Sequence, residues 1–160
     1  MFHAYDFKAK KQKAVAMNYI VYVSKAKAPQ SKKQLADLLE VSRRRNTAEG
    51  VTGLLLYRYS EEYVAGYFIQ AIEGPEGALS DLWRRISADH RHHTIVTLCS
   101  GIETERMFPE WSMGFKNVDA QDLANMPGFA GIDSETFWQN LAANAMPEAL
   151  ELLRGFYGGT

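Results

Sequence analysis

The chain has 160 residues, of which 46% are hydrophobic and 23% charged, and its formal net charge is −1. These values are ordinary for a single globular domain with a sizeable core. The balanced charge gives no general electrostatic case for nucleic acid, and no apolar run approaches the roughly 18 residues that a membrane span needs. One cysteine, Cys99, cannot make an internal disulfide framework, so we expect a cytoplasmic location.

Residues 1–17 carry a lysine cluster without a clear hydrophobic period, and we interpret them as an N-terminal arm or a partner-binding segment. Residues 18–24 (NYIVYVS) are rich in β-formers and have apolar bulk on both faces, which is typical of a central strand. Tyr22 therefore places a hydroxyl near the core, where it must find a hydrogen-bond partner.

A helix is predicted after Ser31, whose side chain can cap it. Its apolar stripe, at helical spacing, consists of Leu35, Leu38 and Leu39. The stripe continues into the polar residues Ser42, Arg45 and Asn46. This polar end is either a frayed helix terminus near Asn46 or a row of donors and acceptors that faces a ligand.

Residues 50–74 read as two strands joined by a polar loop. The first strand, 51–57, is apolar on both faces, as in the middle of a sheet. The second, 67–73, alternates, and its core-facing row contains Phe68, Gln70 and Ile72. A buried amide without a hydrogen-bond partner costs roughly 1–3 kcal/mol, so the fold must supply partners for the Gln70 side chain.

A second helix is predicted from Pro75 onwards, with an apolar stripe made of Leu79, Leu82, Trp83 and Ile86. Arg85 and Asp89 stand four residues apart, so on a helix they form either a solvated ion pair or a pair aimed into a cleft. The sequence HRHH at 90–93 does not have the i, i+4 spacing of a helical metal site, and we expect no metal there. This basic cluster could instead hold a phosphate.

Residues 94–102 are predicted to form another strand, in which Cys99 is an inert core thiol. Trp111, Met113 and Phe115 are expected to share one face of a short last strand. Residues 118–160 have helical stripes with N-caps expected at Asp119 and Ser134. We expect this helical appendage to pack on the domain, on a second subunit or on a partner.

The order strand, helix, strand, strand, helix, strand, strand predicts an α+β fold. We expect a ferredoxin-like, mixed five-stranded sheet over residues 18–117, with two helices on one face and the C-terminal helical appendage after it. The two helices would then enclose a slot whose walls carry Ser42, Asn46, Arg85 and Asp89. Its floor would carry Tyr22, Gln70 and Met113, an arrangement that fits a planar ligand with a polar edge.

These motifs, taken in order, resemble the BLUF family of blue-light sensors that use FAD. The matching stretches are IVYVS, SRRRNTAEGVTGLLLY, FIQAIEG, RRISADHRHH and FPEWSMGF, and they cover residues 18–117. The resemblance implies FAD, or alternatively FMN or riboflavin, bound non-covalently between the two helices. It also implies that Arg45 and Asn46 meet the polar edge of the ring. Arg85, Ile86, Asp89 and His92 would line the cofactor site, with the three polar residues near the ribityl or phosphate side.

The family's photochemistry implies that Tyr22 donates an electron and that Gln70, hydrogen-bonded to the flavin and to Tyr22, relays the proton. The rearranged Gln70 network would be read out by Trp111 and Met113 and passed to the appendage. We expect a photoreceptor without an output enzyme, because about 40 residues are too few for a cyclase domain. It would act through a homo-oligomer or a downstream protein partner.

Two other functions are compatible with the residues. One is a ferredoxin-like protein-interaction module without flavin, which would be colourless. The other is a flavin oxidoreductase, for which the sequence supplies no nicotinamide motif. The chain also departs from the family in the segment 58–66, which is longer than the usual tight turn, and in Arg45, where relatives commonly have a neutral residue. The longer segment would either extend the hairpin beyond the sheet or form a surface contact.

Overall fold

The computed structural model describes residues 16–158, so the expected N-terminal arm lies almost wholly outside the described residues. The elements of the first part are β1 Met17–Ala26, α2 Lys32–Glu49, β2 Thr52–Ser60, β3 Ala65–Gly74, α3 Glu76–Ser87, β4 His92–Glu103 and β5 Gly114–Asn117. Three short helices follow, namely α4 Ala120–Ala124, α5 Glu135–Asn140 and α6 Ala149–Gly158.

The strands form one five-stranded sheet in the order β4-β1-β3-β2-β5. All neighbours are antiparallel except β2 and β5, which run parallel, so the sheet is mixed. This confirms the predicted ferredoxin-like α+β fold. The register of β1 on β3 places Tyr22 directly opposite Gln70.

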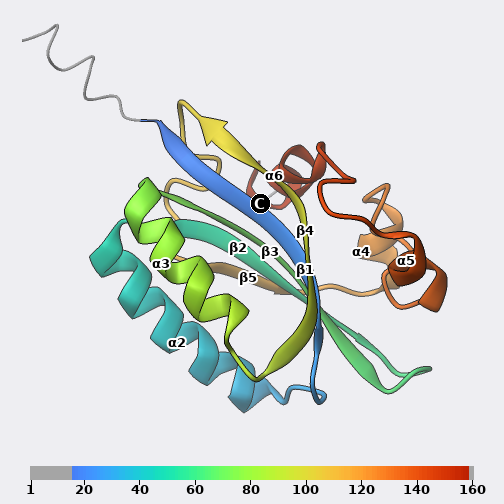
Figure 1. The fold of residues 1–160 in the computed structure, drawn as a ribbon. Helices are drawn as coiled ribbons and strands as arrows, with labels where there is room; N and C mark the ends of the chain where they lie inside the picture. Colours follow the sequence, from blue (N-terminus) through green and yellow to red (C-terminus); the bar gives the residue numbers. More distant parts are fainter. Residues whose placement is uncertain (1–15, 159–160) are drawn as a thin grey trace, which may run out of the picture.

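The helices α2 and α3 lie together on one face of the sheet (Figure 1). Ser31 caps α2 as predicted: its hydroxyl accepts from the amide of Gln34, and the Gln34 side chain accepts from the Ser31 amide. The helix ends at Gly50, whose φ of 74° is the left-handed conformation that glycine adopts readily. Since α2 continues past Asn46, the polar residues of its last turns belong to an ordered helix and not to a frayed end.

The opposite face of the sheet is covered by the C-terminal helices (Figure 1). Strand residues such as Val21, Leu54 and Ile69 share one buried cluster with residues of the appendage, among them Leu123, Phe129, Ile132, Met146 and Leu153. The appendage therefore packs on the sheet of its own chain. Asp119 and Ser134 cap α4 and α5 as predicted, while the expected boundary at residue 117 stays a prediction.

The segment 58–66 extends the hairpin, which is one of the two alternatives stated for it from the sequence. Both strands continue into it, with Arg58 opposite Tyr67 and Ser60 opposite Ala65, and only residues 61–64 form the turn. The extension contacts the appendage: Arg58 forms an ion pair with Asp133 at 2.9 Å, and the Tyr67 and Trp138 rings stack with centroids 5.8 Å apart. Only the predicted strand ends at residues 57 and 67 were too short, because the extension is stabilised by these contacts with residues far away in the chain.

Within the described part of the chain, none of the helices has the length and apolar character required to cross a lipid bilayer.

Candidate functional site

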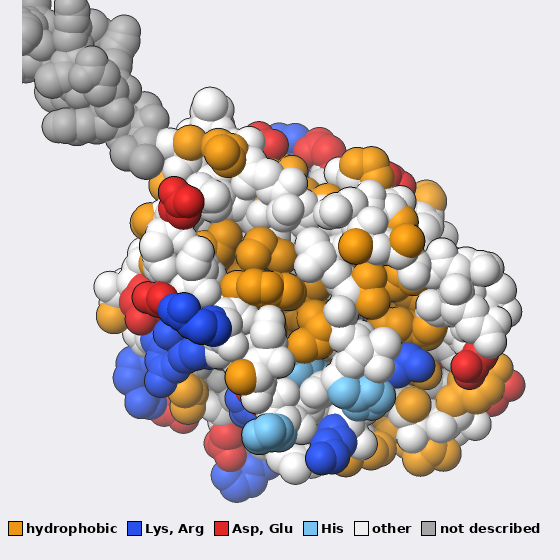
Figure 2. Space-filling view, viewed as in Figure 1, with side chains coloured by type: hydrophobic (Ala, Val, Ile, Leu, Met, Phe, Trp, Pro, Cys, Tyr) orange, Lys and Arg blue, Asp and Glu red, His pale blue; other side chains and the backbone are white. Residues whose placement is uncertain are grey.

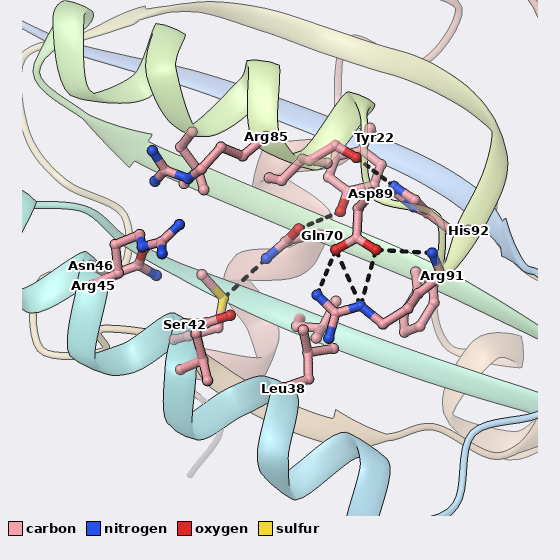
Figure 3. Close-up of a pocket in the computed structure, with 16 residues that line it drawn as sticks. Tyr22, Leu38, Ser42, Arg45, Asn46, Gln70, Arg85, Asp89, Arg91 and His92 are labelled. Carbon is pink, nitrogen blue, oxygen red and sulfur yellow. Dashed lines mark hydrogen bonds and ion pairs between the residues drawn. The ribbon is translucent and has the colours of Figure 1, made fainter.

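A slot opens between α2 and α3 above the middle of the sheet (Figure 3). The empty space in it, counted together with the open solvent at its mouth, is about 830 Å³. The helices line it with Leu38, Val41, Leu82 and Ile86, and the sheet contributes Leu55 and Phe68. The walls are thus apolar, which suits the faces of a flat aromatic ligand.

Polar groups gather at the ends and on the floor of this slot. They are Tyr22, Ser42, Arg45, Asn46, Gln70, Arg85, Asp89, Arg91 and His92. The structure therefore brings together every predicted site residue except Trp111, and Met113 also lines the slot. Lys and Arg side chains gather on the surface over α2 and α3, as Figure 2 shows.

A chain of hydrogen bonds runs across the slot floor from Tyr22 to Met113 (Figure 3). The Tyr22 hydroxyl donates to Gln70 Oε1, and Gln70 Nε2 donates to Met113 Sδ at 3.4 Å. Only 3% of Tyr22 and 8% of Gln70 is exposed. Burial, and secondarily the negative charge of Asp89, raise the pKa of Tyr22 well above its ordinary value, so the phenol keeps its proton at neutral pH.

The end of α2 is tied to the residues just before β5. Asn46, 2% exposed, donates from Nδ2 to the carbonyl of Ser112 at 2.7 Å. Arg43 donates from Nε to the carbonyl of Met113 at 2.8 Å. Within residues 16–158, Asn46 Oδ1 and the Arg45 guanidinium have no protein partner, so an acceptor and several donors remain available at this end of the slot.

Arg85 and Asp89 both line the slot, but the expected pair between them does not form. The helix α3 ends at Ser87, so Asp89 leaves the helical face on which Arg85 lies. Arg85 instead contacts Glu49 of α2 at 3.2 Å. Asp89 accepts from the Arg91 guanidinium, whose Nε is 2.9 Å from Oδ1, and from the Arg91 backbone amide at 2.8 Å. These hydrogen bonds, the side-chain one above all, hold the pKa of the Asp89 carboxyl below its ordinary value.

His92 is held by both of its ring nitrogens. Nε2 lies 2.7 Å from the carbonyl of Ile86, which can only accept, so Nε2 carries a proton. Nδ1 lies 2.7 Å from the hydroxyl of the buried Ser24. In the neutral ring the Ser24 hydroxyl therefore donates to Nδ1, and the imidazole is fixed against Phe68 and Tyr22, with ring centroids 6.2 and 6.0 Å away.

Trp111 and Met113 do not share a face, contrary to the sequence prediction. Both precede β5, which begins only at Gly114, so the alternation of a strand does not apply to them. Met113 belongs to the buried cluster under α2 and α3. Trp111 packs with the cluster on the other face, where its ring stacks on Phe108 with centroids 6.1 Å apart.

Neither a metal centre nor a reactive cysteine was predicted. Among the described residues, no three His, Cys, Asp or Glu side chains lie close enough together to bind a metal ion. Cys99 is buried in the cluster on the appendage side, and burial raises the pKa of its thiol. At neutral pH this side chain is a protonated core thiol.

Two relevant residues were not singled out in the sequence. Arg91 lines the slot and closes over Asp89, but the sequence shows it only as one member of a basic cluster. Glu73 is a carboxylate that is 2% exposed, and it accepts from the amides of Met107 and Phe108, each at 2.7 Å. Glu73 ends the predicted strand 67–73 on the face opposite the row of Phe68, Gln70 and Ile72, so the alternation did not mark this carboxylate as buried.

This site defines a ferredoxin-like small-molecule-binding domain with an aromatic-sized slot and a buried Tyr–Gln pair. The model of the family "Sensors of blue-light using FAD" matches residues 17–114. The chain belongs to this family, BLUF, whose members are flavin-binding blue-light sensors. The resemblance noted from the sequence is thereby confirmed.

The matched region is a small part of two curated relatives. Photoactivated adenylate cyclase subunit beta of Euglena gracilis is 35% identical over 117 residues, which are 72% of this chain and 13% of that protein. The blue light- and temperature-regulated antirepressor BluF of Escherichia coli is 31% identical over 94 residues, or 59% of this chain and 22% of that protein. The chain thus spans about an eighth of the cyclase relative's length.

Solved structures show the same architecture. The dark-state structure of BlrB, described as a BLUF protein, has a TM-score of 0.64 and 29% identity, over 88% of this chain and 97% of that one. A bacterial light-regulated adenylyl cyclase has a TM-score of 0.56 and 33% identity, over 64% of this chain and 28% of that one.

The residues of the slot fit a flavin. Its apolar walls match the two faces of a tricyclic ring. The free Asn46 Oδ1 and the uncommitted Arg45 guanidinium supply an acceptor and donors at one end, which match the carbonyl and N–H groups of a pyrimidine edge.

Proposed function

We propose that this protein is a blue-light photoreceptor that binds FAD non-covalently in the slot between α2 and α3. Asn46, Arg45 and Gln70 would hold the polar edge of the ring. Arg85, Asp89 and His92 would lie toward the ribityl and phosphate side, and Ser42 and Ile86 would line the walls. The observation that carries the proposal is the buried hydrogen bond from Tyr22 to Gln70 on the floor of this slot.

A flavin excited by blue light is a strong oxidant that can take an electron from a nearby phenol, and this is the chemistry that the bound group supplies. Tyr22 is the phenol on the slot floor. Loss of an electron makes a phenol strongly acidic, so its proton would move along the existing hydrogen bond to Gln70 Oε1. Tyr22 thus acts as electron donor and Gln70 as proton relay. The electron and a proton would then return to the Tyr22 phenoxyl, which restores the phenol and leaves Gln70 rearranged.

Protonation at Oε1 changes what Gln70 can donate and accept. In the described structure Oε1 accepts from Tyr22, while Nε2 donates to Met113 Sδ. A Gln70 that has changed tautomer or turned its amide must break or reverse one of these contacts. The change would therefore reach Met113 and the segment before β5, which carries Trp111 and leads into the appendage.

The appendage is suited to receive this signal because it shares a buried cluster with the back of the sheet. Trp111 packs against that cluster and Met113 against the one under the helices, so this short segment touches both faces. The signal would then be passed to a partner protein or to a second copy of the chain.

The test is an absorption spectrum of the purified protein in the dark and after blue light. The expected result is a yellow protein with a bound flavin, whose band moves slightly to the red under light and returns in darkness. Release of the bound flavin by denaturation and its chromatography against FAD, FMN and riboflavin identifies the cofactor. A colourless protein that takes up none of the three would overturn the proposal in favour of an interaction module.

A further inference from the structure

The connection from β4 to β5, residues 104–113, delivers Met113 to Gln70. It passes from one face of the sheet to the other, since Phe108 is buried in the appendage-side cluster and Met113 in the helix-side cluster. It has little regular structure of its own. The position of the Met113 sulfur therefore depends on the side chains that hold this connection.

Glu73 is one of these side chains. Its carboxylate is 2% exposed and accepts three hydrogen bonds. Oε1 accepts from the Met107 amide at 2.7 Å, and Oε2 accepts from the Phe108 amide at 2.7 Å and from the Thr52 hydroxyl at 2.8 Å. Hydrogen bonds to an ionised acceptor are the strong ones, and here they fix two consecutive amides of the connection.

The direction of the Thr52 hydroxyl is determined by its other neighbour. Arg106 donates from a guanidinium nitrogen to Thr52 Oγ1 at 2.9 Å, and a guanidinium can only donate. The single hydroxyl proton of Thr52 is thus free to go to Glu73. Arg106 also donates to the carbonyl of Gly50 at 2.7 Å, and this hydrogen bond links the start of the connection to the residue that ends α2.

Glu73 and Gln70 lie three residues apart on β3, so their side chains point to opposite faces of the sheet. One strand therefore carries both the amide that donates to Met113 and the carboxylate that holds the connection bearing Met113. At the other end of the connection, Arg43 and Asn46 hold the carbonyls of Met113 and Ser112.

We propose that Glu73 is a positioning residue for Gln70: by holding residues 107 and 108 it places Met113 Sδ where Gln70 Nε2 donates to it. The light-dependent part of this inference rests on the proposed function, whereas the placement of Met113 does not. Weakening the anchor at Glu73 should move Met113 and change the behaviour of Gln70, although Glu73 touches neither residue.

The variant Glu73→Gln tests the inference with little change in volume. Its amide keeps one acceptor, which can serve Phe108 and Thr52, but its NH₂ group then faces the Met107 amide, donor against donor. Thr52→Ala is a milder second variant that removes one of the three donors. Glu105→Gln is the control, because Glu105 lies exposed on the same connection.

The first readout needs neither flavin nor light. In protein labelled at the methionine methyl groups, six methyl resonances are expected, and the one lost in Met113→Leu identifies Met113. We expect this resonance to shift or split in Glu73→Gln, to move less in Thr52→Ala and to stay in place in Glu105→Gln. A Met113 resonance unchanged in both folded variants would overturn the inference, whatever the photochemistry.

The second readout is the rate at which the lit state returns in darkness. We expect Glu73→Gln to change this rate by roughly twofold or more, the lower end of couplings within one hydrogen-bond network. In a Met113→Leu background the same substitution should have no further effect, because the sulfur acceptor is already gone. Additive effects would show that Glu73 acts on stability alone and would overturn the positioning role. A parent protein without any light response would instead refute the proposed function and leave the methyl test valid.

Discussion

The Tyr22 hydroxyl donates to Gln70 Oε1 across two paired positions of adjacent strands. Because the β1–β3 ladder sets this pairing, no loop or helix has to move to bring the two groups together. The other end of the amide is held from outside the sheet, because Gln70 Nε2 donates to Met113 Sδ on the connection before β5. A relay built on this pair starts from a geometry that the backbone itself imposes.

Gln70→Leu is expected to keep the bound flavin and to abolish the light-induced shift. The substitution removes one proposed hydrogen-bond partner of the ring but preserves the apolar walls of the slot. It also leaves the buried Tyr22 hydroxyl without its acceptor, which should lower the free energy of unfolding by about 1–3 kcal/mol. Dark and lit absorption spectra and urea unfolding measure the two effects. Gln139→Leu, at an exposed position, is the control, and a normal photocycle in Gln70→Leu would rule out the relay.

Tyr22→Phe should also bind flavin and fail to shift under light, because the phenol proposed to donate the electron is absent together with its proton. The ring itself is retained, so its edge contact with Trp83, at a centroid distance of 5.3 Å, remains. Transient absorption after a blue flash would follow the loss of the excited state. If the variant cycles like the parent, another aromatic residue is the donor, and Trp111→Phe is then the next variant to measure.

Much of this site could be predicted because its residues belong to regular elements. The strand alternation predicts Gln70 in a core-facing row. The helical spacing of α2 predicts that Ser42, Arg45 and Asn46 continue the apolar stripe of the helix. The face of Trp111 could not be predicted in this way, since it lies on an irregular connection where neither period applies. The Arg85–Asp89 pair failed for a related reason: α3 ends between the two residues.

The hairpin extension shows a second limit of local patterns. Arg58, Tyr59 and Ser60 are polar enough to look like a loop, yet they form strand pairs. Their strand conformation is supported by distant residues, as Asp133 pairs with Arg58 and Trp138 stacks on Tyr67. Such contacts depend on the path of the whole chain and leave no signal in the segment itself.

The buried phenol of Tyr22 predicts a pH dependence of stability. Its pKa is raised by burial, so above the ordinary tyrosine pKa of about 10 the unfolded chain has lost this proton while the folded chain keeps it. The unfolded state then binds fewer protons, and the free energy of unfolding falls as pH rises, by up to about 1.4 kcal/mol per pH unit for one group. Below that pH the contribution of Tyr22 is fully present.

Urea unfolding of the parent and of Tyr22→Phe at several values between pH 8 and pH 11 isolates the contribution of Tyr22 to the free energy of unfolding. Other tyrosines with raised pKa, such as Tyr57 and Tyr67, are common to both proteins and cancel in the difference. The stability advantage of the parent should be constant up to about pH 9.5 and then shrink by roughly 1 kcal/mol by pH 11. A difference that stays constant over the whole range would mean that Tyr22 ionises freely in the folded protein.

The location of the flavin can be tested by filling the slot. Ser42→Trp places a large ring between α2 and α3 at a half-buried position, so it should block flavin uptake while the helix stays folded. Glu40→Trp, on the exposed side of the same helix, is the matched control and should bind flavin like the parent. Flavin titration followed by fluorescence, with circular dichroism to confirm folding, gives the comparison. Equal binding by the two variants would place the flavin elsewhere.

The ion pair between the hairpin and the appendage gives a last prediction. Arg58 and Asp133 have side chains only 16% and 25% exposed, and Arg58 Nε is buried without a partner among the described residues. Asp133→Asn keeps the shape but leaves a mostly buried cation without its counter-charge, which should cost about 1–3 kcal/mol of unfolding free energy.

The matched control is Asp37→Asn, which removes one member of the Lys33–Asp37 pair on α2. Those side chains are 83% and 62% exposed, so the loss should stay within about 0.5 kcal/mol. Urea unfolding compares the two variants, and amide hydrogen exchange should show faster opening of residues 58–66 in Asp133→Asn alone. Equal, small effects in both variants would mean that the appendage does not stabilise the hairpin extension through this pair.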